Sequence, residues 1–145
     1  MPHIEKSALI LHSAADMCAL VDDIDRYPEF LPWCGGASVL RRDAATAIAT
    51  ILIDYRGIRQ SFTTENLRVG DAWIDMRFVD GPFRKLDGRW TFQALEAAAC
   101  KVSLALDYEF ASAVLAKAVG PVFEFVASTM IDRFIARADQ VYGGP

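Results

Sequence analysis

The sequence holds few of the side chains from which metal or nucleophilic sites are built. Its 145 residues include three cysteines, Cys18, Cys34 and Cys100, and two histidines, His3 and His12. No two cysteines form a C-x-x-C pair, so the closely spaced ligands of a structural zinc site are missing. Both histidines fall on or beside one expected strand, which leaves a nucleophilic serine or cysteine without a base in reach. An odd number of well-separated cysteines favours a reducing compartment, with the thiols buried as small apolar groups.

The chain also lacks a basic stripe and a long apolar run. Its formal net charge is −4 and its pI is about 5.1, and the densest basic spots are the pairs Arg41-Arg42 and Arg84-Lys85. Direct DNA binding is therefore not expected, because neutralisation of phosphates supplies most of that affinity. The start of the chain shows no secretory h-region, and no apolar run approaches the ~18–20 residues that span a bilayer. We expect a soluble protein whose contact with a membrane, if any, is peripheral.

What the sequence does contain is apolar residues in regular patterns. Hydrophobic residues make up 53% of the chain, slightly more than is usual for a soluble domain. Two interpretations remain open: a very dry core, or a core that its own side chains do not fill. The length fits one domain that spans residues 1–145.

Hydrophobic periodicity predicts the order strand, two short helices, six strands and one long helix. A first strand at 4–12 precedes an amphipathic helix at 14–23, for which Ser13 has the chemistry of an N-cap. The long helix covers 112–142, and Gly120-Pro121 predicts a kink within it. The six strands between the helices are placed at 36–42, 46–55, 59–67, 72–79, 85–94 and 100–110.

The segment 27–34, YPEFLPWC, combines two prolines with four large apolar side chains. The prolines limit it to a short turn of helix. The apolar side chains must pack on something or form a contact surface. Two readings stay open: a lid at the mouth of a cavity that dips into a membrane surface, or a plug in the core under the sheet.

Two further motifs favour turns. Gly81-Pro82-Phe83 fits a hairpin turn better than a cap over a cavity. Asp87-Gly88 predicts a tight turn or a bulge near the start of a strand.

One long helix cannot cover a seven-stranded sheet unless the sheet curls around it. Several strands alternate apolar and polar residues, a pattern typical of antiparallel sheets with one buried face. The predicted fold is therefore α+β: a curved, seven-stranded antiparallel sheet around a long C-terminal helix, with two short helices after the first strand. This geometry leaves space for an apolar small molecule between helix and sheet.

The order and the local motifs resemble the helix-grip fold of START-like lipid-binding domains, over essentially the whole chain. The bacterial coenzyme Q-binding branch, which also contains ribosome-association toxin proteins, is the most similar part of that superfamily. The motifs that carry the resemblance are the segments 27–34, 83–92, 99–102 and 108–112, then 120–123 followed by Met130, Phe134 and Arg137-Ala138.

The resemblance implies a non-enzymatic protein that binds ubiquinone or a related polyprenyl lipid and supports respiratory electron transport, with no required cofactor. It implies a place in the bacterial cytoplasm, with transient contact at the inner membrane surface. Binding of the large ribosomal subunit, which would block subunit joining, is an alternative. A cyclase or aromatase activity, as in polyketide cyclases of the same superfamily, is a second alternative. The candidate ligand-binding residues are Tyr27, Phe30, Leu31, Trp33, Phe62, Met76, Phe78, Phe83, Trp90, Leu104, Val119, Phe123, Val126 and Met130.

Overall fold

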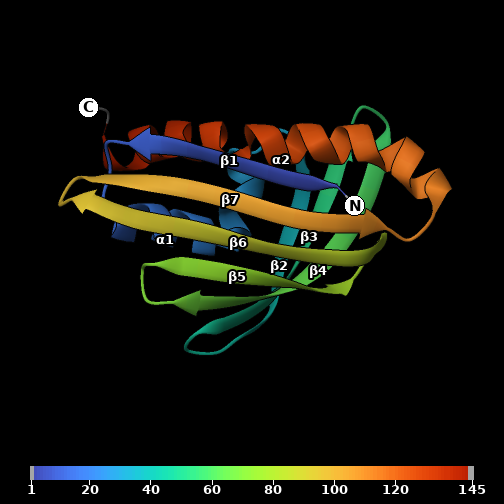
Figure 1. Ribbon diagram of the computed structural model, residues 1–145, viewed down its shortest axis with the longest axis horizontal. Coiled ribbons are helices and arrows are strands. Elements are labelled where there is room, and N and C mark those ends of the chain that lie inside the picture. The colour runs from blue at the N-terminus through green and yellow to red at the C-terminus, as the bar shows by residue number, and fades with distance from the viewer. Residues whose placement is uncertain (1, 144–145) are drawn as a thin grey trace.

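The computed structural model describes residues 2–143 and contains one seven-stranded antiparallel sheet. Its strands follow the order β1-β7-β6-β5-β4-β3-β2, so every neighbouring pair except β1 and β7 is consecutive in the chain. This architecture, with one long helix after the last strand, confirms the predicted α+β fold (Figure 1). The strands are β1 (His3–Ile10), β2 (Cys34–Arg42), β3 (Thr46–Tyr55), β4 (Ile58–Val69), β5 (Trp73–Asp80), β6 (Phe83–Glu96) and β7 (Ala99–Phe110).

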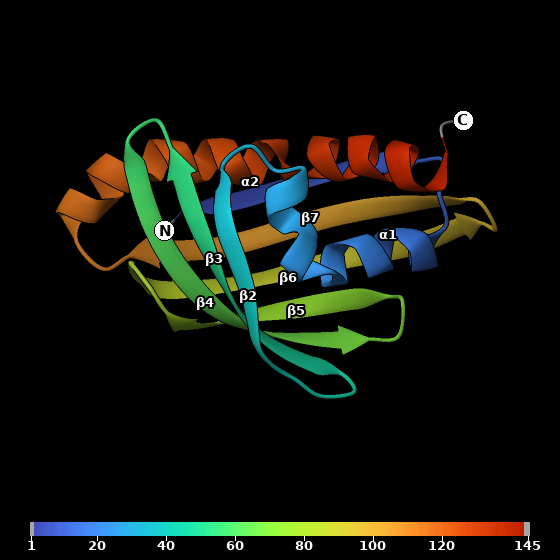
Figure 2. The same ribbon diagram turned by 180° about the vertical axis from the view of Figure 1, so that it is seen from behind.

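The sheet is strongly curved. β5, β6 and β7 run along the long axis of the molecule, while β2, β3 and β4 cross it steeply (Figure 2). The pairing is irregular in β2, between Thr63 and Thr64 in β4, and near both ends of β6. Such bulges bend strands and increase their twist, which lets the sheet wrap around a helix.

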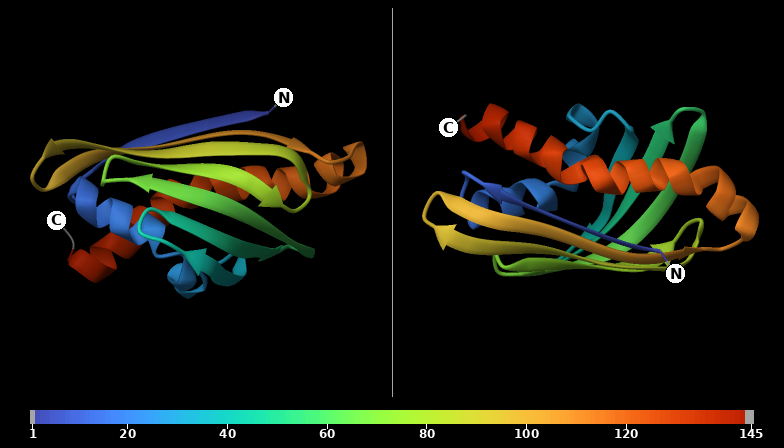
Figure 3. Two further views of the ribbon diagram at one scale, coloured as in Figure 1. Left: turned by 90° about the horizontal axis from the view of Figure 1, so that it is seen from below. Right: turned by 45° about the horizontal axis from the view of Figure 1, so that its top comes forward.

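Two short helical segments and one long helix occupy the concave side. α1 (Ala14–Asp22) and the 3-10 helix η1 (Ile24–Glu29) connect β1 to β2, and α2 (Ala113–Tyr142) crosses the open side of the half-barrel (Figure 3). The side chain of Ser13 accepts a hydrogen bond from the Asp16 amide, as its predicted N-cap role requires. Ser112 caps α2 in the same way through the Leu115 amide.

α2 is one uninterrupted helix of 30 residues, despite Pro121 within it. Its first turns lie at an angle to the rest of the helix (Figure 1), as the proline predicts. α2 also holds an 18-residue window of mean hydropathy 1.5, so it is long and apolar enough to cross a membrane by length and composition alone. The expectation that no apolar run reaches this length was therefore wrong. In this structure the buried side of α2 packs against the sheet through Val119, Phe123, Val126, Ala127, Ile131, Phe134 and Ala138.

Three local predictions need correction. β1 ends at Ile10 instead of residue 12, because the chain turns there toward the Ser13 cap. The helical turn expected within 27–34 begins earlier, as η1, and ends at Glu29. Asp87-Gly88 forms neither a turn nor a bulge, since both residues pair regularly inside β6 with Asp107 and Leu106 of β7.

Candidate functional site

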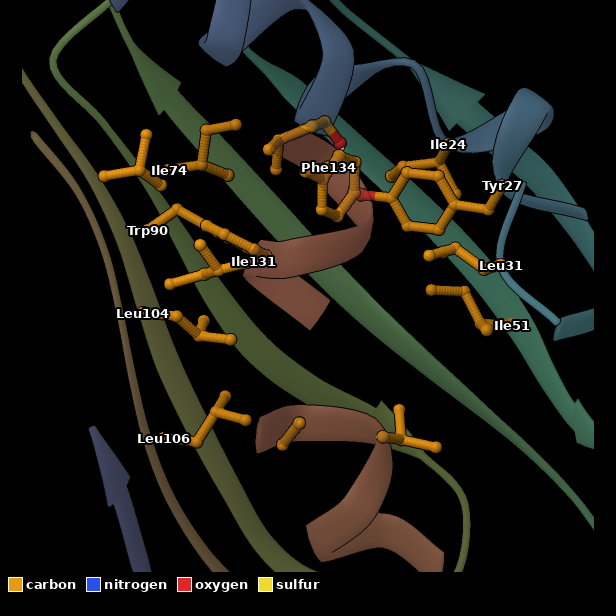
Figure 4. Close-up of a cluster of buried hydrophobic side chains, with 14 of the residues drawn as sticks. Ile24, Tyr27, Leu31, Ile51, Ile74, Trp90, Leu104, Leu106, Ile131 and Phe134 are labelled. Atoms are coloured by element: carbon orange, nitrogen blue, oxygen red, sulfur yellow. Dashed lines mark hydrogen bonds between the residues drawn. The ribbon is translucent and has the colours of Figure 1, made fainter. Parts of the chain in front are cut away.

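A small, mostly apolar cavity lies between α2 and the concave face of the sheet. Its volume is about 60 Å³. Figure 4 shows the side chains around this part of the interior, with Tyr27, Leu31 and Ile51 facing Trp90, Leu104 and Leu106 across it. The lining residues are Ile24, Tyr27, Trp33, Ile51, Phe62, Thr64, Asn66, Met76, Leu86, Trp90, Leu104, Leu106, Phe123, Val126, Ala127 and Met130.

Two short side chains of β3 pair with two lining residues of β4. Ala47 and Ala49 of β3 are buried, and they pair with Asn66 and Thr64 of β4. Gly88 of β6 has no side chain where a Cβ would lie 2.5 Å from Leu106 Cδ2 and 2.7 Å from Met76 Cε. Because Gly88 has no Cβ, the ends of the Leu106 and Met76 side chains can occupy the space beside it. Both of these side chains line the cavity.

One end of the cavity is closed by a cluster of aromatic rings around Phe83. The Phe83 ring stacks on Phe110 at 4.9 Å and meets Phe123 at 5.0 Å and Phe62 at 6.0 Å, between ring centroids. Phe62 and Phe123 line the cavity, whereas Phe83 lies behind them. Edge-to-face and stacked pairs of this kind add stability beyond their buried area.

The other end is closed by rings from η1, β6 and α2. Phe134 of α2 packs edge-on against Tyr27 at 5.4 Å, Phe30 at 5.3 Å and Trp90 at 5.4 Å. The Tyr27 hydroxyl donates a hydrogen bond to the Val21 carbonyl of α1, and burial raises the pKa of this phenol. This end therefore ties both short helical segments to α2 and the sheet.

The lining carries few polar groups. The Thr64 hydroxyl donates to Asn66 Oδ1 at 2.9 Å. The indole Nε1 of Trp33 is buried and has no hydrogen-bond partner among the described residues. The cavity lining thus combines a hydroxyl–amide pair on β4 with mostly apolar side chains.

Nine of the candidate ligand-binding residues line the cavity: Tyr27, Trp33, Phe62, Met76, Trp90, Leu104, Phe123, Val126 and Met130. The other five lie elsewhere. Leu31, Phe83 and Val119 are buried in the surrounding core, and Phe30 and Phe78 are half-buried against it. The ligand-binding role of these residues stays a prediction.

Seven lining residues were not among the candidates: Ile24, Ile51, Thr64, Asn66, Leu86, Leu106 and Ala127. Alternation along β4 and β7 places Thr64, Asn66 and Leu106 on the same face as Phe62 and Leu104. That signal is present in the sequence, but the polar side chains of Thr64 and Asn66 do not by themselves indicate an apolar site. Ile24 and Ala127 could be found only from the packing of η1 and α2 against the sheet.

The segment 27–34 is a plug in the core. Tyr27, Leu31 and Trp33 are at most 4% exposed, so they offer no surface to a membrane. Arg137 of α2 fixes the segment from outside, because it donates to Glu29 at 2.8 Å and lies 5.0 Å from the centre of the Phe30 ring. The reading of this segment as an exposed lid is therefore wrong for this conformation.

Both histidines lie away from the cavity. His12 is buried, and its Nε2 lies 2.7 Å from Asp139 Oδ1 near the end of α2. His3 lies on the edge strand β1, where its exposed side chain places Nδ1 2.7 Å from Asp107 Oδ1 of β7. The three cysteines are buried and separate from one another in the core. None of these five side chains lines the cavity.

The half-barrel, the long helix across it and the apolar cavity between them define a START-like domain. The chain matches the sequence model of the family described as polyketide cyclase / dehydrase and lipid transport over residues 10–135, and it belongs to that family.

Similar proteins in other organisms carry two kinds of name. The chain is 44% identical over 143 residues to a Vibrio cholerae protein named ribosome association toxin RatA, and the match covers 99% of each. It is 41% identical to the Pseudomonas aeruginosa protein of the same name, covering 97% of this chain and 98% of that one. A Dictyostelium discoideum protein named coenzyme Q-binding protein COQ10, mitochondrial, is 27% identical, covering 86% of this chain and 63% of that one.

Solved structures agree with the fold. An 18 kDa protein from Caulobacter crescentus matches with a TM-score of 0.76 and 30% identity, over 99% of this chain and 100% of that one. A Streptomyces aromatase/cyclase matches with a TM-score of 0.87 over 99% of both chains. At 15% identity, the second likeness concerns the fold alone.

Proposed function

We propose that this protein binds a polyprenyl quinone or a similar apolar ring compound between α2 and the sheet, and that it acts as a carrier. The observation that supports this most directly is the cavity itself, enclosed by the helix and the sheet and lined almost entirely by apolar side chains. Sites for small molecules are typically of this kind, with a few polar groups that orient the ligand. The similarity to a coenzyme Q-binding protein gives the ligand class.

The cavity must widen to accept such a ligand. Its volume of about 60 Å³ is less than half of the ~150 Å³ in which an apolar protein cavity holds benzene. Met76 and Met130 line opposite sides, on β5 and α2, and both are only partly buried. Methionine side chains have three rotatable bonds and adapt to irregular spaces, so these two are suited to move aside.

Met76 also marks a route for entry. It lines the cavity and, in addition, a groove on the sheet formed by Glu65, Leu67, Asp75, Arg77 and Gly88 among others. Rotation of this one side chain would join the groove to the cavity. We propose that the isoprenoid tail leaves the cavity at this point.

A carrier role fits the chemistry of the lining better than catalysis does. The cavity lining holds no histidine, lysine or carboxylate that could transfer a proton. The solved aromatase/cyclase structure resembles this protein in fold only. The phenol of Tyr27 is engaged with the Val21 carbonyl. We therefore infer that no covalent step takes place in the cavity.

The test is to purify the protein from its native host and to analyse extracted lipids by mass spectrometry, together with titration by a short-chain ubiquinone. We expect a prenylated quinone at measurable occupancy and saturable binding of the probe. The absence of any lipid together with no binding of the probe would refute the proposal.

Ribosome association is the second candidate. Its support is the name of relatives that are 39–44% identical over nearly the whole chain. The net charge of −4 favours contact with a ribosomal protein over contact with rRNA. Sucrose gradients after overexpression would show more free subunits and fewer monosomes, and an unchanged ratio would count against this function.

A further inference from the structure

The first half of α2 presents an apolar surface that the rest of the fold does not cover. Only 28% of the most apolar 18-residue window of α2 is buried in the structure. Val114 is 77% exposed and Phe125 is 38% exposed, and Ala118 and Pro121 between them are exposed as well. Spacings of three and four residues place these four on one face of the helix, which we call the α2 ridge. A contiguous apolar surface of this kind marks a site of interaction.

The charges along α2 divide the helix into two halves. Residues 112–123 contain one charged side chain, Lys117, and Glu124 is the only carboxylate between residues 112 and 131. Beyond the α2 ridge the same face continues with Ser128 and Asp132, which are polar. The apolar surface is therefore confined to the first half of the helix. It suits a helix that lies along an apolar boundary better than one that crosses a bilayer, since the other side of α2 is already packed on the sheet.

The turn between β3 and β4 adds an aromatic ring and a cation to the α2 ridge. The Tyr55 ring stacks on the Phe125 ring with 5.3 Å between their centroids. The guanidinium carbon of Arg56 lies 5.2 Å from the centre of the Tyr55 ring and 5.9 Å from that of Phe125. Figure 2 shows this turn beside the first half of α2. On the helix itself, Lys117 is exposed and lies next to Val114 and Pro121 by its spacing.

We propose that the α2 ridge, together with Tyr55, Arg56 and Lys117, docks this protein on an anionic lipid surface, with the first half of α2 lying in the headgroup region. An apolar helix face beside basic residues is typical of helices that bind in this way, and tyrosine is enriched at the same depth. A nucleic acid would pair with the two cations but leave the apolar side chains uncovered. The chain as a whole carries a net charge of −4, so an anionic membrane favours approach by the face on which cations outnumber carboxylates.

The experiment is cosedimentation of the full chain with vesicles made of equal parts phosphatidylglycerol and phosphatidylcholine, and with vesicles of phosphatidylcholine alone. The vesicles contain no quinone, so this docking is tested independently of the quinone-binding function. We expect the wild type to bind the anionic vesicles more tightly, by about fivefold for each of the two cations. Val114→Asp should weaken this binding at least about tenfold, because it removes one apolar side chain from the lipid contact. Arg56→Asn should weaken it about fivefold.

Both substitutions are compatible with the fold. Val114 lies in the first turn of α2, where a carboxylate is favoured by the helix dipole. Arg56 and Gly57 have positive φ angles of 51° and 80°, and asparagine adopts this conformation in two-residue hairpin turns more readily than arginine does. Neither variant should therefore unfold at a lower temperature than the wild type. Neither residue lines the cavity, so titration with a short-chain ubiquinone should give the wild-type affinity in both.

Leu9→Asp is the matched control. Leu9 is 75% exposed near the end of β1, which lies at the opposite end of the molecule from the start of α2 (Figure 1). This variant receives the same charge at the same exposure and should bind anionic vesicles as the wild type does. No binding of the wild type to anionic vesicles, or wild-type binding by Val114→Asp, would overturn the docking and leave the quinone-binding function standing. Self-association or cosedimentation with large ribosomal subunits that Val114→Asp abolishes, without any binding to vesicles, would assign the α2 ridge to a protein partner and overturn the proposal as well.

Discussion

Replacement of Gly88 by alanine tests whether a ligand uses the hollow that the structure shows. The new Cβ would lie 2.5 Å from Leu106 Cδ2 and 2.7 Å from Met76 Cε, whereas carbon atoms in contact prefer about 3.5–4.0 Å. Both neighbours are flexible side-chain ends, so they can move by about 1 Å. Because both line the cavity of about 60 Å³, movement into it leaves less space for a ligand.

Two opposing effects set the magnitude. Overpacking of a core by one methyl group costs about 1–3 kcal/mol. Alanine in a strand recovers roughly 0.5–1 kcal/mol relative to glycine through the smaller entropy of the unfolded chain. The free energy of unfolding of Gly88→Ala should thus fall by up to about 2.5 kcal/mol. Quinone affinity should fall about tenfold, the equivalent of about 1.4 kcal/mol, because the ring must displace the same Met76 and Leu106 atoms.

The assays are urea unfolding followed by tryptophan fluorescence and calorimetric titration with a short-chain ubiquinone. Gly120→Ala is the matched control, since its Cβ would meet only Phe110 Cε2, at 3.7 Å, and it lies within α2. Alanine should stabilise this helix by up to ~1 kcal/mol and leave binding unchanged. Wild-type affinity in Gly88→Ala would refute the reasoning that places the ligand beside Met76.

Three further predictions concern the frame of the cavity. Phe83→Ala should lower the free energy of unfolding by about 3–5 kcal/mol in chemical denaturation, because it removes the ring on which Phe62 and Phe123 pack; a loss below about 1 kcal/mol would contradict this. Ser112→Ala should cost about 1 kcal/mol in the same assay through loss of the α2 N-cap, and an unchanged midpoint would argue against the cap. Burial raises the pKa of the Cys18 thiol to about 11 from 9.0, so the native state holds this proton more tightly than the unfolded chain, and stability should fall as the pH rises from 9 toward 11. Iodoacetamide should modify Cys18 only after unfolding, and rapid labelling of the native protein at pH 8 would refute its burial.

Much of the fold could be predicted because it depends on local patterns. Alternation in β7 places Val102, Leu104 and Leu106 on one buried face, as the structure confirms. Ser13 and Ser112 have the chemistry that begins a helix, and each caps one. The bounds of the elements could not be predicted in the same way, because the end of β1 depends on how the chain turns into α1.

The site was predicted in part. Large side chains such as Phe62, Trp90 and Phe123 were among the candidate residues, and they line the cavity. Phe83 was also a candidate, yet it lies one layer behind Phe62 and Phe123, because depth within a core cannot be read from the sequence pattern. Asn66 was missed since a polar residue on an inward face has no apolar signal.

The sequence by itself determined the order of the elements, the buried face of each strand and the need for a sheet that curls around one helix. Those properties follow from side-chain chemistry at fixed intervals along the chain. Only the tertiary structure decided that the segment 27–34 is a plug, that Gly88 leaves room beside Met76 and Leu106, and that the Trp33 N–H lacks a partner. These features depend on distances between residues from different strands and helices, which the packing of the whole domain sets.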